Sequence, residues 1–325
     1  MKRCIRIKKW VIFWISFGAL VGLGPIQSAQ AASGGQKKEL KIALLPILDV
    51  LPFFAAEAEG FFAGGGFKIT AVPVASGLAR DELMQAGEID GMLNEMTTTG
   101  SFNRNGVRIK ILISARKAHA RFPMFRILAS PKSGFTTPSD LTGVPIGVSK
   151  NTIIEYVTDR MLGAKGLSGK QIVVKSVPVI PERYQLLMQG QLKAATLPDP
   201  LGKSALAAGA VSMVDDSAYP QYSVSVLSFS VEALKDKGEG IRFFLKAWDR
   251  AVEKINANPE AYRALLLKKI RVPKNVQEGY PVPFYPRKEV PGVEQWADVM
   301  KWMVEKGLLD SPLPYKDSVT TAFLP

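Results

Sequence analysis

The sequence predicts an α/β protein of two similar lobes, with mixed sheets flanked by helices. Three observations lead to this expectation. Short apolar, strand-like runs alternate with helical patterns over the first two thirds of the chain, as in α/β folds. One strand–helix–strand pattern occurs twice, at an offset of 103 to 105 residues. The last third is largely helical, and we expect it to return and cover the first lobe.

The N-terminal 31 residues are predicted to be a secretory signal peptide. Five basic residues and no acid precede the apolar segment 10–24, and Ala29-Gln30-Ala31 has the small-x-small pattern of a cleavage site. An uncleaved membrane anchor is the alternative. The apolar segment disfavours it, because it is shorter than the ~20 residues that a spanning helix needs. Cleavage after Ala31 would lower the net charge from +13 to about +8.

The cysteine and charge content indicate an unanchored periplasmic protein. The single cysteine, Cys4, lies in the predicted signal segment, so the mature chain would have no disulfide, thiol nucleophile or cysteine-bound metal. Cys4 precedes the apolar segment and therefore cannot be a lipid-bearing cysteine, which follows it. A moderate positive charge suits a soluble protein. No basic run interleaved with aromatic residues predicts nucleic-acid binding.

The expected strands follow the apolar runs between breakers such as Pro46. They lie at residues 41–45, 67–74, 91–93, 108–114, 125–129, 144–148, 172–179 and 194–197. After residues 223–227 the chain turns largely helical. Two apolar stripes at three- and four-residue steps are predicted to be core: Ile241, Phe244, Leu245, Trp248, Val252, Ile255, and Val293, Trp296, Met300, Met303, Val304.

The repeat predicts how the chain divides. "RDELMQAGEIDGMLNE" (80–95) matches "RYQLLMQGQLKAATLP" (183–198), and "ITAVPV" (69–74) matches "VVKSVPV" (173–179). Two collinear copies indicate two lobes with one plan. We expect the first lobe at residues 38–122 plus 226–325, the second at 123–225, and two crossover segments with a cleft between the lobes.

Ligands of open α/β sheets lie beyond the carboxyl ends of the strands, so the loops there are the candidate binding site. Asp49 is either a ligand contact or a partner for amides of the helix that Pro52 begins. Thr152 and Glu155 fit a capping box. The candidate ligand-binding residues are Pro46, Leu48, Asp49, Ser76, Gly77, Asn94, Glu95, Met96, Thr97, Asn151, Thr152 and Asp199.

Motifs for catalysis are not evident. His119 is the single histidine, and the triple glycine 64–66 lacks the Lys-Ser/Thr of a phosphate loop and precedes a strand. We interpret 64–66 as a helix end and turn. The sequence thus predicts a binding protein without catalytic residues, cofactor or metal.

The chain resembles the periplasmic substrate-binding proteins of ABC importers, in the nitrate, sulfonate, taurine and thiamine-precursor group. The resemblance rests on "AAEAEGFFAGGGFKI", "ELMQAGEIDGML", "DLTGVPIGVS", "KNTIIEYVTDRML", "ERYQLLMQGQLKAATLPDPL" and "VMKWMVEKGLL". It implies a two-lobe Venus-flytrap fold of the type II periplasmic binding proteins. It also implies a monomer that captures a small molecule and docks to ABC permease subunits with an ATPase on the cytoplasmic side.

Two other functions are compatible with that fold. A thiamine-pyrimidine synthase-like enzyme would carry a cysteine-rich iron-binding motif, which this sequence lacks. A periplasmic sensor subunit that presents a ligand to a receptor kinase is the other alternative, and neighbouring genes would distinguish it from a transport protein.

The ligand class is predicted from charge. Asp49, Glu95 and Asp199 stand near three strand ends, which favours an N-heterocycle or amine rich in N–H donors, with Met96, Tyr184, Phe229 and Tyr285 as candidate flat walls. We further expect Asp199 to face the Asn94-Glu95 turn across the cleft. The alternative is a sulfonate, nitrate or other small anion, for which the Thr152 helix start, Lys150 and Arg116 are the candidate contacts.

Overall fold

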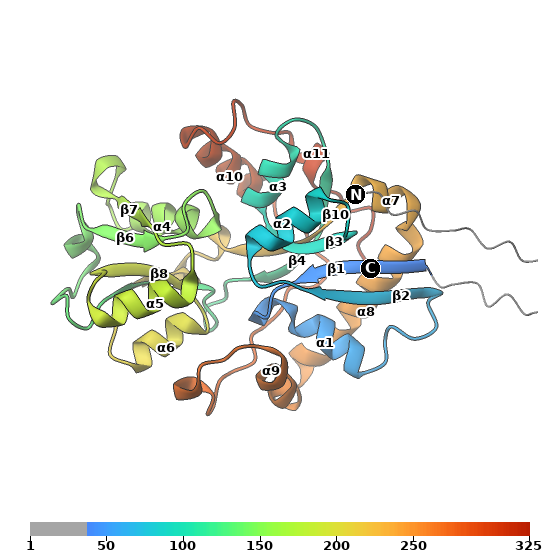
Figure 1. Ribbon diagram of the computed structural model, residues 1–325, viewed down its shortest axis with the longest axis horizontal. Helices are drawn as coiled ribbons and strands as arrows, with labels where there is room; N and C mark the ends of the chain where they lie inside the picture. The colour runs from blue at the N-terminus through green and yellow to red at the C-terminus, as the bar shows by residue number, and fades with distance from the viewer. Residues whose placement is uncertain (1–37) are drawn as a thin grey trace, which may run out of the picture. The chain divides into compact units, whose positions relative to one another are not determined.

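A computed structural model describes residues 38–325, which form two five-stranded mixed sheets flanked by helices (Figure 1). The predicted signal peptide lies outside the described residues. The predicted fold class is confirmed. The first sheet has the order β2-β1-β3-β10-β4: β1 (Lys38–Leu44), β2 (Phe67–Pro73), β3 (Gly91–Glu95), β4 (Ile109–Lys117), β10 (Val224–Ser230). The second has the order β7-β6-β8-β5-β9: β5 (Phe125–Ala129), β6 (Pro145–Val148), β7 (Val173–Ser176), β8 (Ala194–Pro198), β9 (Val211–Asp215).

The two sheets have the same topology and nearly the same register. β1 is parallel to β2 and β3, and β6 is parallel to β7 and β8. Ile42 lies opposite Gly91 in the first sheet, as Ile146 lies opposite Ala194 in the second. The fourth strand of each sheet is antiparallel to both of its neighbours: β10, which follows the second lobe in sequence, in the first sheet, and β5, which begins the second lobe, in the second sheet. The repeat in the sequence is therefore a repeat of structure.

We call each sheet with its flanking helices a lobe. The helices are α1 (Leu51–Ala58), α2 (Gly77–Gln85), α3 (Met96–Asn103), α4 (Ile153–Ala164), α5 (Ile180–Gln189), α6 (Leu201–Ala207), α7 (Val231–Asp236), α8 (Gly238–Ala257), α9 (Arg263–Lys269), α10 (Val293–Glu305) and α11 (Tyr315–Ser318). The chain crosses between the sheets at residues 118–124 and 216–223. The bounds 38–122, 123–225 and 226–325 stay predictions.

The first apolar stripe packs as predicted. Phe244, Leu245 and Trp248 of α8 are fully buried, in one cluster with α1 and strands of the first sheet. Complete burial of such a side chain contributes about 1.5–3 kcal/mol to stability. The first lobe therefore owes its core to a helix more than 190 residues after β1 in sequence.

The second apolar stripe differs from the expectation that the tail covers only the first lobe. Trp296, Met300 and Met303 of α10 share one core cluster with Met96 of α3 and Tyr156 of α4, so α10 packs against both lobes. This close approach needs a glycine on α3: a Cβ added at residue 100 would lie 2.8 Å from the Met303 sulfur.

Polar contacts also attach α10 to α4 of the second lobe. Trp302 Nε1 donates to Asp159 at 2.8 Å, and Lys306 Nζ lies 2.8 Å from Asp159 and 2.9 Å from Glu155. Sequence periodicity marks α10 as buried, but it cannot say which neighbours bury it.

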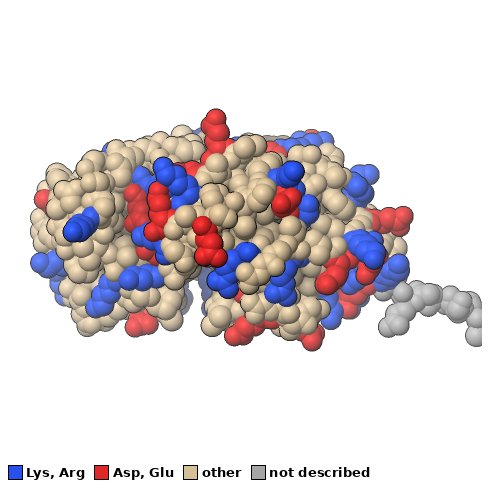
Figure 2. Space-filling model, turned by 90° about the horizontal axis from the view of Figure 1, so that it is seen from above, with Lys and Arg blue, Asp and Glu red and all other residues tan. Residues whose placement is uncertain are grey.

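Two further features of the described residues bear on function. Figure 2 shows positive and negative side chains interspersed over the face seen there, rather than gathered by sign. Within residues 38–325, none of the helices combines the length and the apolar character needed to cross a membrane.

Candidate solute-binding cavity

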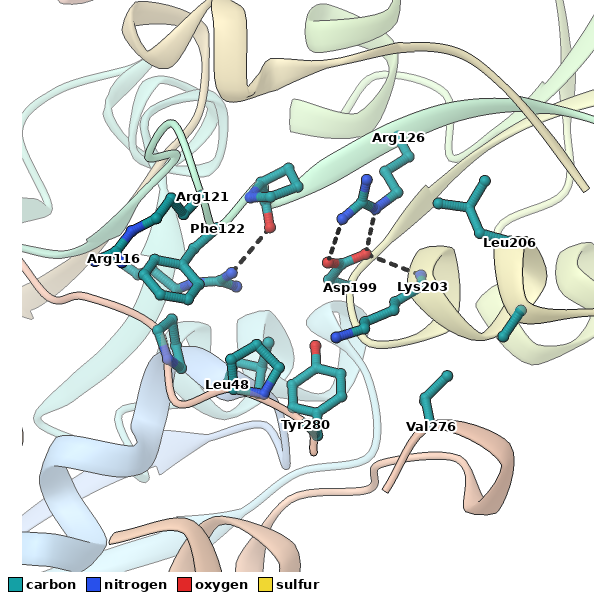
Figure 3. A pocket seen from close by; sticks show the side chains of 14 residues that line it. Leu48, Arg116, Arg121, Phe122, Arg126, Asp199, Lys203, Leu206, Val276 and Tyr280 are labelled. Carbon is teal, nitrogen blue, oxygen red and sulfur yellow. Dashed lines mark hydrogen bonds and ion pairs between the residues drawn. The ribbon is translucent and has the colours of Figure 1, made fainter. Parts of the chain in front are cut away.

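A cavity of about 340 Å³ lies where the carboxyl end of β1 meets strands and loops of both lobes (Figure 3). Leu48 follows β1, Arg116 belongs to β4, and Tyr280 comes from the loop after α9. The second lobe contributes Arg126 of β5 and Asp199, which directly follows β8. This volume is within the range of small-molecule sites in proteins, about 300–1,000 Å³.

Arg116 is the buried cation of this cavity. Its side chain is 3% exposed. Nη1 lies 3.4 Å from an Asp49 oxygen, and Nη2 donates to the Pro123 carbonyl at 3.1 Å. Nε has no hydrogen-bond partner among the described residues. Burial, the largest single effect, favours the neutral guanidine, but the Asp49 carboxylate together with Tyr285, Tyr280 and Asp199 outweighs it and raises the pKa of Arg116. The guanidinium therefore stays charged, and its Nε–H is not used by another residue of the described chain.

Arg126 and Asp199 form a second charged pair in the wall. Arg126 Nε and Nη2 donate to the two Asp199 oxygens at 2.9 and 3.2 Å, and Nη1 reaches Asp215 at 3.2 Å. The Asp199 carboxylate also accepts the Lys203 amide at 3.0 Å. Asp199 is therefore hydrogen-bonded by protein groups through both oxygens.

Apolar side chains form the rest of the wall. Leu48, Phe122 and Val276 line the cavity beside the ring of Tyr280, and Lys203 Nζ lies 5.0 Å from the centre of that ring. Burial, together with the nearby Asp199 charge, raises the pKa of Tyr280. Its hydroxyl therefore stays protonated at neutral pH and can donate a hydrogen bond.

The other two predicted acids are also paired. Asp49 accepts a 2.5 Å hydrogen bond from Ser225 besides its contact with Arg116, and it caps no helix. Glu95 lies 3.6 Å from Arg80 Nη1 and accepts from Thr98 at 3.2 Å. Each acid thus has a protein cation beside it. The predicted preference for an amine is not confirmed. The prediction counted the three acids, but the sequence does not reveal that each acid is paired with an arginine in the folded protein.

Among the other candidate residues, Ser76 caps α2 by accepting the Ala79 amide, and Gly77 begins that helix. Pro46 is partly buried between β1 and the turn that contains Leu48. Asn151 and Thr152 line a second cavity of about 360 Å³, whose other walls come from α2, α3 and the residues that follow α3. The Thr152 hydroxyl caps α4 by accepting the Ile154 amide, and the Glu155 carboxylate accepts the Asn151 amide. The predicted capping box is therefore wrong in detail, because it would pair Thr152 with the Glu155 amide and Glu155 with the Thr152 amide.

The Asn94–Thr97 turn is buried, and the cavity of Arg116 does not include it. Asn94 bonds Thr99 and Ser228, and Met96 belongs to the core. Thr97 is 2% exposed, and its hydroxyl lacks a hydrogen-bond partner among the described residues. Asp199 and this turn therefore do not share a cavity in the structure.

Three of the predicted flat walls are core residues, and most of the cavity lining was not predicted. Phe229 and Tyr285 are fully buried in the core of the first lobe, and Met96 is fully buried in the core cluster that it shares with α10. Arg126, Lys203 and Tyr280 are among the lining residues that were not predicted. Arg126 in the apolar strand "FRILA" was the available signal, because an arginine inside a buried strand needs a partner.

The structure defines a class of fold: two lobes of one topology, with a cavity where they meet, have the periplasmic-binding-protein fold. The chain belongs to the NMT1/THI5-like family, whose sequence pattern matches residues 48–262. A protein of Brachyspira hyodysenteriae (strain ATCC 49526 / WA1), named as an ABC transporter periplasmic binding protein, is 26% identical over 276 residues. That match covers 80% of this chain and 76% of the relative.

Solved structures show the same fold. The alkanesulfonate-binding protein of Xanthomonas axonopodis pv. citri, bound to MOPS, has a TM-score of 0.71 at 18% identity, covering 87% of this chain and 98% of that chain. A desulfurization enzyme has a TM-score of 0.63 at 15% identity, covering 88% of this chain and 97% of that chain. The fold therefore serves both binding proteins and an enzyme.

Proposed function

We propose that this protein is the periplasmic solute-binding component of an ABC importer and captures a small organic anion in the cavity of Arg116. The observation that carries the ligand class is the buried, charged guanidinium of the cavity-lining residue Arg116, whose Nε has no hydrogen-bond partner among the described residues. The transport role is supported by the name of the Brachyspira relative. Its partners would be the permease subunits, to which it docks as a monomer after its signal peptide is removed.

The charges of the wall favour an anion. Arg116, Arg121 and Lys203 line the cavity besides the Arg126–Asp199 pair, so cations exceed acids. Hydrogen bonds from charged donors to an anionic acceptor are about twice as strong as neutral ones. A sulfonate or carboxylate could accept from Arg116 Nε and the Tyr280 hydroxyl.

The apolar wall favours an organic body on that anion. Leu48, Phe122 and Val276 would contact carbon atoms of a solute whose charged group lies at Arg116. The MOPS bound to the Xanthomonas protein is a ligand of this kind, a sulfonate with an organic ring. Among candidate ligands for this cavity, we therefore propose organic sulfonates and carboxylates rather than nitrate or amines.

We propose that the protein binds and does not catalyse. His119, the single histidine of the chain, lies beside Phe122 and Phe284 with ring centres 5.7 and 5.5 Å apart, and it does not line the cavity. Recovery of every stabilising solute unchanged after incubation with the protein is the expected result. Conversion of any of them would contradict this part of the proposal.

A thermal-shift screen tests the ligand class, because a solute that binds only the folded state raises the apparent stability by RT ln(1 + [L]/Kd). Alkanesulfonates, taurine and aromatic carboxylates form one set, and aminopyrimidines and amines form the other. We expect stabilisation by members of the first set. Stabilisation by amines alone would overturn the proposal.

Arg116→Met should then weaken binding of the best anion by about 10- to 150-fold, the range for losing a charged hydrogen bond worth about 1.5–3 kcal/mol. Because this change also unpairs buried Asp49, the double variant Arg116→Met/Asp49→Asn separates binding from folding. Arg104→Met, in the wall of the second cavity, is the matched control and should bind normally. An affinity unchanged in the double variant would remove Arg116 from the site.

A further inference from the structure

Arg183 of α5 is a fully buried arginine that no acid neutralises. Its exposed fraction is 0%, and it forms no ion pair with any residue of 38–325. Nη1 donates to the Ser149 hydroxyl at 3.3 Å, and Nε and Nη2 have no partner in the described part of the chain. Burial lowers the pKa of Arg183 to about 10, so the guanidinium is still charged at neutral pH.

The first lobe shows what an arginine at this place ordinarily requires. Arg80 occupies the equivalent position of α2 in the repeat. It has Asp81 at 2.8 Å and Glu95 at 3.6 Å, and it donates to the Leu93 carbonyl at 3.0 Å. In the second lobe, the positions of the two acids are held by Tyr184 and Pro198. The second lobe therefore has the arginine of this position but neither of the two carboxylates that neutralise it in the first lobe.

The guanidinium of Arg183 lies at the carboxyl end of β6. Its stem crosses Gly147, where an added Cβ would be 3.3 Å from Arg183 Cγ. Ser149, the residue that Arg183 contacts, begins the loop that leads through Lys150 and Asn151 into α4, a helix of 12 residues. Lys150 and Asn151 are exposed, so this buried charge lies just beneath the surface of the lobe.

We propose that Arg183, Ser149 and the N-terminus of α4 form a second anion site, for a small oxyanion: an inorganic ion such as sulfate, or the sulfonate or carboxylate group of an organic solute. A buried cation without a counter-charge is costly, and an anion beside it removes that cost. Nε and Nη2 form the planar fork that binds two oxygens of one oxyanion. The N-terminus of a helix adds amide donors and a favourable dipole.

This site is separate from the cavity of Arg116, which Arg183 does not line. The loop above it also carries the cation Lys150, which favours an anion further. The one acid near the start of α4, Glu155, is engaged by the Asn151 amide and Lys306. Because Arg183 is fully buried, an anion reaches it only if neighbouring residues move, and the exposed Lys150–Asn151 loop is the candidate for that movement.

The experiment uses sulfate and hexanesulfonate as probes, with the full-length mature protein at constant ionic strength. The melting temperature of wild type, Arg183→Met and Arg116→Met is measured as each probe is titrated. With sulfate, we expect a saturable rise in wild type that Arg183→Met loses and Arg116→Met retains. With hexanesulfonate, which the proposed function also places at Arg116, Arg116→Met should weaken the response in any case, so only the effect of Arg183→Met tests this site. Comparison with Arg183→Met removes the general stabilisation by sulfate, which acts through exclusion from the protein surface.

The two probes distinguish the source of the anion. Loss of the sulfate response in Arg183→Met indicates an inorganic-anion site, and loss of the hexanesulfonate response alone indicates a subsite for the anionic group of the solute. Full responses to both probes in Arg183→Met, or the absence of a saturable response to either probe in wild type, overturn the proposal. Arg183→Gln gives a second reading if the methionine variant does not fold. Loss of binding in Arg116→Met but not in Arg183→Met would leave the proposed function intact while this inference fails.

Discussion

Arg80 in the first lobe and Arg183 in the second hold equivalent places in two sheets of the same order and register, yet their surroundings differ. Arg80 has two carboxylates beside it, and Arg183 has a serine hydroxyl. The backbone plan of a lobe is fixed by apolar periodicity and strand register, which both lobes share. The polar contacts depend on single side chains, so they diverge without disturbing the plan. The same substitution at equivalent residues of the two lobes should therefore change the free energy of unfolding by different amounts.

The largest difference is expected between the two arginines. Arg80→Met leaves Glu95 without its cation, and breaking a buried pair by removing one partner costs about 3–5 kcal/mol. We expect about 3 kcal/mol, because the Glu95 side chain is 26% exposed. Arg183→Met removes an unpaired charge and should leave stability unchanged or increased in buffer without oxyanions. Urea unfolding of both variants measures the contrast, and equal losses of stability would break the comparison.

The two crossovers are joined at both ends, and the two junctions differ in a way that pH should reveal. At the second lobe, Asp216 accepts the Met124 and Phe125 amides at 2.8 and 3.0 Å and so holds the start of β5. At the first lobe, the junction is instead a backbone bond, from the Ala118 amide to the Ser223 carbonyl. Burial raises the pKa of Asp216 to about 6 from 3.8, against the hydrogen bonds that lower it.

The sign of the effect follows from this pKa. Between about pH 4 and 6 the folded protein keeps the Asp216 proton that the unfolded chain has lost, so this group's contribution to stability falls as pH rises, by up to about 3 kcal/mol. Asp216→Asn removes this titration. The stability of wild type minus that of the variant, from urea unfolding at pH 4, 5, 6 and 7, should decrease over this window. A difference that stays level or increases with pH would contradict the prediction.

A smaller effect is expected where α10 joins the lobes. Asp298 accepts from the Tyr156 hydroxyl at 2.7 Å and from Arg160 Nε at 2.8 Å, both on α4. Asp298→Asn should lower the free energy of unfolding by about 1 kcal/mol, because the Asp298 side chain is 37% exposed and its ion pair is partly screened. Lys301→Met on the same helix is the control, since its pair with Glu305 is exposed and spans 3.9 Å. Equal effects of the two changes on the free energy of unfolding would indicate that the contacts of Asp298 with α4 do not stabilise the protein.

The fold could be predicted because its signals are local. Residues 125–129 have apolar alternation between breakers and form β5 at the predicted bounds. β9 (Val211–Asp215) was missed, since its "VSMVD" is short and carries only three apolar residues, although Gly209 separates it from α6. The docking of α10 was missed because a helical stripe reports that a face is buried and not what buries it.

The site was less predictable because it depends on pairing. Leu48 and Asp199 line the cavity as candidates for the site, but the partners of Asp49, Glu95 and Asp199 are arginines 67, 15 and 73 residues away in sequence. The acids alone favoured an amine. The arginines neutralise these acids and so remove the basis of that preference, and no spacing rule connects the arginines to the acids.

The return of β10 to the first sheet, after the whole second lobe, also sets an order for assembly as the chain is synthesised from its N-terminus. The second sheet is contiguous, from Phe125 to Asp215, and can complete itself as soon as β9 is available. The first sheet cannot, because β10 must enter between β3 and β4. While the more than 100 residues between β4 and β10 are synthesised, β3 and β4 therefore each have one strand edge without its β10 partner. Non-local pairings of this kind are slow to form, so the last sheet to close is the one whose first strand was made earliest.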